Sequence, residues 1–197
     1  GNVVVNGTLD LAGKDQTVNG LSGSGTIDTT AGTTPTLTIG ANDGAGTFSG
    51  VIQNSTGTLS LAKIGNGSIT LSGGAANTYD GTTDISVGTL VAAKDAALGT
   101  ADNTAGTGST VTSGAMLTIA GANVGNEKLS IAGTGAGSAG ALQGTGTSAI
   151  GGTITLSNDA SIGAAGSSDV LSLAGSVTAS NKNLTKVGNG TVVLGAA

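Results

Sequence analysis

Apolar and small polar side chains alternate along most of this chain, and one short phrase recurs. A glycine and a hydroxyl residue are followed by an apolar, a variable and an apolar residue, as in Gly57-Thr58-Leu59-Ser60-Leu61 and Gly152-Thr153-Ile154-Thr155-Leu156. A spacing of two places both apolar side chains on one face of a β-strand. A strand this short cannot bury that face alone, so its natural partner is the next copy stacked upon it. The pattern therefore predicts a stacked, repetitive β-structure.

Turn-forming segments separate these strands. Segments such as Ala41-Asn42-Asp43-Gly44 and Gly133-Thr134-Gly135-Ala136-Gly137 are rich in residues that tolerate a positive φ. The nearest approach to a helix, residues 91–98, contains a few alanines and is too short to be stable by itself. We therefore expect an all-β chain. We rank a solenoid above a pilin-type β-sandwich because the glycine-led phrase recurs.

The composition limits the width of the core and the class of partner. The 197 residues include one Phe, one Tyr and no Trp, so the core must be narrow and built from small aliphatic side chains. Six basic residues stand against 11 acidic ones, and the net charge of −5 is spread thinly, so we expect no nucleic-acid partner. The chain has no Cys for disulfides or thiolate metal sites. Its apolar runs are too short to predict a membrane span.

A longer repeat contains the short phrase. The run from Leu61 through Lys63 and Gly65-Asn66-Gly67 to Leu71 returns from Leu184 through Lys186 and Gly188-Asn189-Gly190 to Leu194. After the first copy the chain continues with Asn77-Thr78-Tyr79, Gly81-Thr82-Thr83 and Gly88-Thr89-Leu90. In this order the motifs resemble the autotransporter-associated β-strand repeat, also called the passenger-associated transport repeat. One repeat covers residues 61–90, and residues 184–197 resemble the opening of a second.

The resemblance implies a right-handed parallel β-helix within a large secreted or surface-displayed bacterial protein. If each coil uses roughly 20 to 25 residues, residues 1–197 form a single solenoid array of about eight to ten rungs. Asp80 departs from the family pattern, which often has Thr there. The Gly-Asn-Gly segments suit corners where the backbone turns sharply. The predicted structural turns are accordingly Gly65, Asn66, Gly67, Gly188, Asn189 and Gly190.

The acidic residues do not form a recognisable catalytic or metal-binding set. Asp80 and Asp84 are the nearest pair, but they flank a Gly-Thr-Thr turn, where Asp commonly hydrogen-bonds its own backbone. Without His or Cys only an oxygen site for a hard cation remains, and the regular glycine-aspartate series of a calcium-binding β-roll is absent. We predict no catalytic residue, no cofactor and no metal ligand.

Tyr79 is the one possible ligand contact, because an aromatic face suits stacking on a sugar. A core position is the stronger interpretation for Tyr79, and the same holds for Phe48. Thr-x-Thr pairs such as Thr36-Leu37-Thr38 and Thr153-Ile154-Thr155 also occur on ice-binding β-helices. Their irregular spacing here favours simple strand propensity over an ice-matching face.

These observations favour a structural function over an enzymatic one. We expect a non-catalytic stalk or spacer of adhesin type in an extracellular or cell-surface bacterial protein. Two alternatives remain: a subunit of an extracellular filament or biofilm matrix fibre, joined through unpaired strand edges, and a module that binds glycans or ice. The expected partners are a further length of the same solenoid, another copy of the chain stacked end to end, or a host or matrix glycan.

Overall fold

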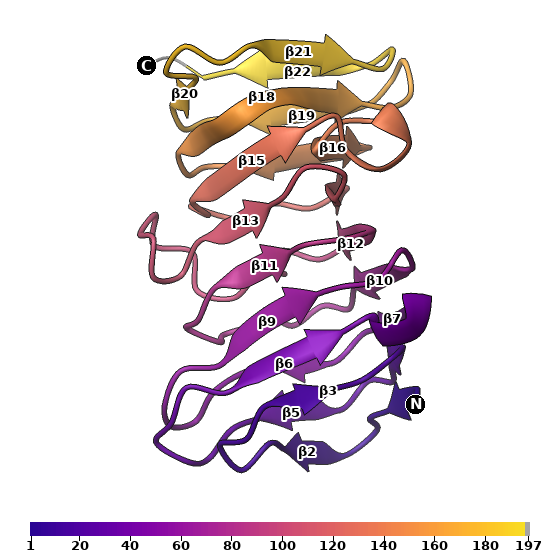
Figure 1. The fold of residues 1–197 in the computed structure, drawn as a ribbon, viewed down its shortest axis with the longest axis vertical. Helices are drawn as coiled ribbons and strands as arrows, with labels where there is room; N and C mark the ends of the chain where they lie inside the picture. The colour runs from indigo at the N-terminus through magenta and orange to yellow at the C-terminus, as the bar shows by residue number, and fades with distance from the viewer. Residues whose placement is uncertain (196–197) are drawn as a thin grey trace.

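The chain folds as a stack of short parallel β-strands. A computed structural model describes residues 1–195, and Figure 1 shows their strands lying one above another from the N-terminal end to the C-terminal end. Neighbouring turns pair in parallel register, and the stack is a β-solenoid of about eight turns. Two short 3₁₀ segments, η1 (Ala41–Asp43) and η2 (Ala136–Ser138), are the only helical elements among the described residues.

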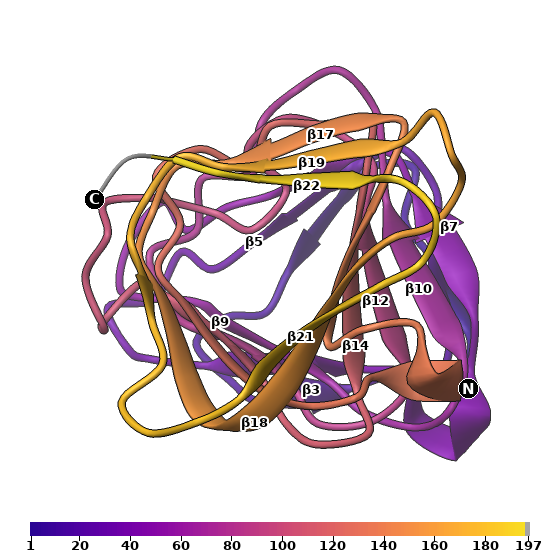
Figure 2. The same cartoon turned by 90° about the horizontal axis from the view of Figure 1, so that it is seen from above.

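The strands form three faces around the stack (Figure 2). The first face contains β3 (Gln16–Thr17), β6 (Thr36–Ile39), β9 (Ser60–Lys63), β11 (Thr83–Ile85), β13 (Ser109–Val111), β15 (Leu129–Gly133), the start of β18 (Ile154–Ala164) and β20 (Val177–Thr178). The second face contains β7 (Gly46–Phe48), β10 (Ser68–Leu71), β12 (Thr89–Ala92), β14 (Met116–Ala120), β16 (Leu142–Thr145), the end of β18 and β21 (Leu184–Val187), with β1 (Val3–Val4) and β4 (Leu21–Ser22) below β7. The third face contains β2 (Thr8–Asp10), β5 (Thr26–Asp28), β8 (Val51–Ile52), β17 (Thr147–Ile150), β19 (Val170–Leu173) and β22 (Thr191–Leu194).

The strand β18 joins the first two faces into one sheet. Its beginning pairs with β15, through Ile154 and Leu156, and its end pairs with β16, through Ile162. Apart from a shift between Ile131 and Gly133 in the β15–β18 pairing, the register along the stack is regular. The number of residues per turn nevertheless varies. Paired positions lie 18 residues apart at Val3 and Leu21 and 27 residues apart at Leu90 and Leu117. The strands therefore keep a common register while the loops between them absorb the variation in length.

Aliphatic side chains stack in ladders along the inside of each face. On the second face one ladder consists of Ile69, Leu90, Leu117, Leu142 and Ile162, which are in register from turn to turn and almost fully buried. Parallel pairing brings each of these side chains over its counterpart at about 4.8 Å, the spacing of neighbouring strands. The solenoid thus has one continuous core, and each turn covers the apolar side of its neighbours.

The two Gly-Asn-Gly segments are bends between strands. Gly65 has φ +69° and Gly188 has φ +76°, in the left-handed region that favours glycine. A Cβ on Gly65 would also lie 2.0 Å from the carbonyl oxygen of Gly40 in the preceding turn. At the second corner, a Cβ on Gly190 would lie 2.5 Å from the carbonyl oxygen of Asp169. Glycine is needed at these corners because the backbone reverses sharply while passing close to the turn beneath it.

The all-β class and the stacked parallel architecture predicted from the sequence are confirmed. The turns number about eight, at the low end of the expected range. Residues 91–98 form no helix: Val91 and Ala92 belong to β12, and the alanines after them form a turn. The β-sandwich alternative is wrong for this chain, because a sandwich of that type is built from antiparallel strands.

Leu90→Ala tests the contribution of the ladders. Leu90 is fully buried between Ile69 and Leu117, so we expect the substitution to lower the free energy of unfolding by about 2–5 kcal/mol. The neighbouring Val91 is only half-buried and faces outward, and Val91→Ala is the matched control, with an expected loss of about 0.5 kcal/mol or less. Urea unfolding followed by circular dichroism measures both. Equal losses for the two variants would contradict the assignment of inward and outward positions.

Candidate functional site

At each Gly-Asn-Gly corner a lysine side chain donates hydrogen bonds to backbone carbonyl oxygens. The Lys63 side chain is fully buried, and its Nζ donates to the carbonyl oxygens of Ile64 at 2.8 Å, Gly65 at 2.7 Å and Val87 at 3.1 Å. Val87 belongs to the next turn, so the same ammonium holds the corner and links two turns. Burial lowers the pKa of Lys63 to about 8, and the three carbonyls replace the water that the ammonium has lost.

The second copy of the motif repeats this contact. Lys186 Nζ donates to the carbonyl oxygen of Gly188 at 2.5 Å, although Lys186 lies on the last described turn and is exposed. At the first copy Asn66 adds a link to the preceding turn, because its backbone N–H and its Nδ2 donate to Asp43 Oδ1 at 2.7 and 3.0 Å. The glycines and asparagines of both corners were predicted as structural turns, whereas the lysines were recognised as part of the motif without a predicted role. Their recurrence two residues before the first glycine in both copies was the available signal.

Aspartate side chains link the loops of neighbouring turns. The Asp28 carboxylate accepts hydrogen bonds from the Ser55 backbone N–H at 2.8 Å, the Ser55 hydroxyl at 2.6 Å and Gln53 Nε2 at 2.8 Å. Burial raises the pKa of Asp28, but the hydrogen bonds outweigh it, and the net effect lowers that pKa below its usual value. Comparable links to a neighbouring turn are made by Asp10, Asp15, Asp43, Asp80, Asp95, Asp159 and Asp169. We call these contacts the aspartate links.

Asp80 and Asp84 do not form a catalytic pair. Asp80 accepts from Thr100 Oγ1 at 2.6 Å and from Asn54 Nδ2 at 3.2 Å, so it joins loops of other turns and does not bond its own backbone as the sequence suggested. Asp84 is exposed on the first face and accepts from the nearby Thr82 hydroxyl at 3.3 Å. The two carboxylates therefore have separate partners.

The asparagine of the Asn-Thr-Tyr motif, Asn77, is buried and forms hydrogen bonds to the preceding turn and to the next one, a contact that we call the Asn77 junction. Asn77 Oδ1 accepts from the Ile52 backbone N–H at 3.0 Å and from Lys94 Nζ at 2.8 Å, while its Nδ2 donates to the Ala97 carbonyl at 2.6 Å. Lys94 Nζ also donates to the Gly50 carbonyl at 2.7 Å, and burial lowers the pKa of Lys94 to about 8. The motif thus supplies a polar side chain that satisfies backbone groups inside the stack.

The two aromatic side chains lie in the core. Tyr79 and Phe48 are both fully buried, and the Tyr79 hydroxyl lies 2.6 Å from Thr83 Oγ1. Burial raises the pKa of the Tyr79 phenol. Neither ring is available for stacking on a sugar at the surface, so Tyr79 is a packing residue and not the ligand contact considered from the sequence.

A second polar group lies inside the first face, next to Tyr79. Thr83 and Ser109 pair in register between Leu61 and Leu129 and interrupt that ladder with two hydroxyl groups. Ser109 Oγ donates to Glu127 Oε1 at 2.6 Å, and Glu127 is fully buried. We call Tyr79, Thr83, Ser109 and Glu127 the buried polar cluster. Glu127 was not predicted as a site residue, although it stands two residues before Leu129 and both side chains are buried.

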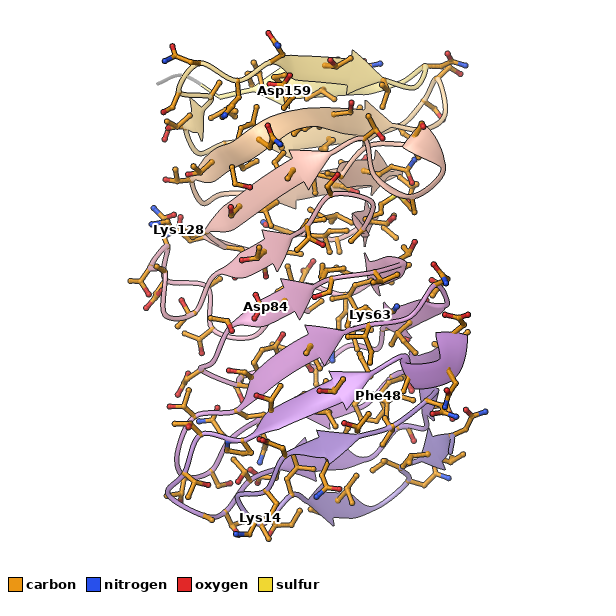
Figure 3. All side chains as sticks on the ribbon, viewed as in Figure 1. Lys14, Phe48, Lys63, Asp84, Lys128 and Asp159 are labelled. Carbon is orange, nitrogen blue, oxygen red and sulfur yellow. The ribbon has the colours of Figure 1, made fainter. Side chains whose placement is uncertain are left out.

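The outward side of the first face carries small hydroxylated side chains. One row consists of Thr38, Ala62, Asp84, Thr110, Ser130 and Thr155, which are in register from turn to turn. The structure thus places the Thr-x-Thr pairs on a common face, but Asp84 and Lys128 lie between them (Figure 3). These charged side chains interrupt the regular hydroxyl array that an ice-matching surface would need.

A groove of about 320 Å³ opens on this face beside the loop of residues 99–108. Thr110 and Ser130 line it from the face and Ala105 lines it from the loop. The loop is held by Asn103, whose Oδ1 accepts from the Thr153 N–H at 2.8 Å and whose Nδ2 donates to Thr153 Oγ1 at 3.3 Å. The described lining contains hydroxyls and Lys128 but no carboxylate, so it has no pair of groups for acid–base chemistry.

No group of three or more His, Cys, Asp or Glu that could hold a metal ion occurs within residues 1–195. No described helix has the length and apolar character needed to cross a bilayer.

Comparison with known proteins gives no match: no protein-family model, curated protein or solved structure shows significant similarity to this chain. The resemblance to the autotransporter-associated repeat therefore depends on the motifs at residues 61–90 and 184–197. The solenoid fold fits a repeat-type protein.

Asp28→Ala tests the aspartate links. The substitution removes three hydrogen bonds to the next turn, and we expect it to lower the free energy of unfolding by about 1–3 kcal/mol at pH 7. The pKa of Asp28 in the folded chain lies below the ordinary value of 3.8, so this stabilisation is present above that pH and is lost as the pH falls through the folded pKa. The difference between the wild type and the variant should therefore shrink as the pH falls from about 4 towards 2. Urea unfolding across this range measures it.

Asp84→Ala is the matched control, because Asp84 contacts no neighbouring turn through the hydrogen bonds described above. We expect this variant to unfold like the wild type at both pH values. A difference between wild type and Asp28→Ala that is the same at pH 7 and pH 2 would contradict the role of the ionised carboxylate.

Proposed function

We propose that this chain is a non-catalytic spacer in an extracellular bacterial surface protein of the adhesin or autotransporter-passenger type. The observation that carries the proposal is the continuity of the stack. The ladders, the corner lysine Lys63 and the aspartate links all connect one turn to the next, so a load along the axis is shared by many parallel contacts. About eight turns at about 4.8 Å give a rod of roughly 40 Å.

Two observations support the proposed location at the cell surface, the sequence motifs and the surface chemistry. The repeat at residues 61–90 resembles repeats of exported passengers, and its Gly65 corner and Asn77 junction both have defined structural roles. The outward side chains of the first face are mainly small and hydroxylated, as suits a rod exposed to water. These features support a scaffold that holds another region of the protein away from the cell.

A filament subunit is the second candidate, because the last described turn exposes apolar side chains. Leu184 and Leu194, which continue the inward positions of Ala160 and Leu173, are 36% and 58% exposed. A further turn would cover them, and that turn could come from continuation of the chain or from a second copy. The glycan- or ice-binding alternative has less support, because both aromatic rings are buried and the hydroxyl rows are interrupted.

Surface display tests the spacer function. The chain is inserted between an outer-membrane anchor and an epitope, and the height of the epitope above the membrane is measured by fluorescence interference or cryo-electron tomography. We expect an increase of roughly 40 Å over the same fusion without the insert, because the solenoid is a stiff rod. A fusion carrying Leu90→Asp and Leu117→Asp, which break the core, is the control and should give no defined height.

Negative-stain microscopy of the purified chain separates the two candidates. Short particles of fixed length support the spacer. Long fibres that disappear in Leu194→Lys would support the filament instead and would contradict the spacer as the function of the isolated chain.

A further inference from the structure

Glu127 is the one glutamate of the chain, and its side chain is fully buried. Its Oε1 accepts a hydrogen bond from Ser109, but Oε2 has no hydrogen-bond partner among the described residues. A buried carboxylate needs a cation or several donors to compensate for lost water, and a single hydroxyl donor is far too little. The site therefore accommodates the carboxylic acid and not the carboxylate.

The groups around Glu127 also favour the neutral carboxylic acid over the carboxylate. Tyr79, two turns before Glu127, contributes a neutral phenol, whose hydroxyl is already bonded to Thr83. Asp102, in the loop before β13, contributes a negative charge that disfavours a second one on Glu127. Lys128 is adjacent in sequence but lies on the outward side, in the lining of the groove. Burial is the main cause of the raised pKa of Glu127, which lies at about 8, and the charge of Asp102 adds to it.

The backbone around Glu127 lies outside the regular strand ladders of the stack. Between β14 and β15, residues 121–128 form no strand, and two isolated bridges, Asn123 with Ala149 and Asp102 with Asn126, lie in this segment. Single backbone hydrogen bonds also join it to neighbouring turns, for example from the Gly151 N–H to the Gly125 carbonyl oxygen at 2.6 Å. The second bridge connects this segment to the loop of residues 99–108, which is also without a strand. A segment outside the strand ladders can open locally, by breaking its own single hydrogen bonds, without unfolding the ladders on either side.

We propose that Glu127 is a pH-sensitive latch in this turn of the solenoid. While Glu127 is neutral, residues 121–128 stay packed over the buried polar cluster. When Glu127 loses its proton, the carboxylate is hydrated by opening of this segment together with the 99–108 loop. The groove on the first face is lined by Gly108 and Lys128 from these two segments, so the opening also changes the shape of that groove.

The sign of the pH dependence follows from the shifted pKa. The pKa of Glu127 in the folded chain, about 8, lies above the ordinary value of 4.5, so the stabilisation is complete below about pH 4.5 and is lost as the pH rises through 8. The difference between these two pKa values of Glu127 corresponds to a change on the order of a thousandfold in the opening equilibrium. Lys63 and Lys94 act in the opposite sense, since their pKa values are lowered to about 8 and they add stability only as the pH rises further.

Direct titration of Glu127 is the first test. Because the chain has one glutamate, labelling with [δ-¹³C]glutamate gives one carboxyl resonance in the whole folded chain. We expect a midpoint near pH 8. A midpoint near 4.5 in the folded protein would overturn the proposal, and this measurement needs no variant.

Hydrogen exchange measured by mass spectrometry tests the opening itself. After correction for the intrinsic exchange rate, protection of residues 121–128 and 99–108 should fall a hundredfold to a thousandfold between pH 5 and pH 9, while residues 60–71 stay protected. Glu127→Gln keeps the shape and the acceptor for Ser109 but cannot ionise, so its protection should not depend on pH in this way. Asp84→Asn, which removes an exposed carboxylate, should behave like the wild type. The same loss of protection in Glu127→Gln would show that another group controls the opening and would overturn the proposal.

Discussion

Each turn of this chain has apolar side chains directed inward and small polar ones directed outward, and a single turn cannot enclose its own apolar side. Only another turn in parallel register can do so, because parallel pairing puts like positions directly above one another. From this constraint follow the period of two in the strands, the ladders of Leu, Ile and Val, and the sharp glycine corners. It also explains how loops of very different length coexist with a constant strand register.

A narrow core has little room for unpaired polar atoms, and most of those that lie inside this one have partners in the backbone. Lys63 is surrounded by carbonyls of its own corner and of the next turn, and Asn77 bonds groups from two other turns. Such contacts stabilise the stack only where each group is satisfied. Glu127 is the exception within the described residues, since one of its oxygens has no partner. This unsatisfied oxygen is why we assign Glu127 a role that depends on its protonation state.

The local features of this fold could be predicted from the sequence, and the contacts between turns could not. Alternation and glycine content are properties of neighbouring residues, so the strands, the corner at Gly65 and the buried position of Tyr79 were accessible. The partners of Asp28, Lys63 and Glu127 lie on other turns. Because the number of residues per turn varies from 18 to 27, counting along the chain does not identify which residues meet.

The central claim is that successive turns stack coaxially with constant spacing, and distances between spin labels on one outward row test it most directly. The chain has no native Cys, so cysteines can be placed in pairs at Thr38 and Ser130, four turns apart, and at Thr38 and Thr178, six turns apart. Double electron–electron resonance should give Cα separations of about 19 Å and about 29 Å after allowance for the label, rising in proportion to the number of turns. Distances that do not grow with the number of turns would contradict the stacked solenoid and the account built on it.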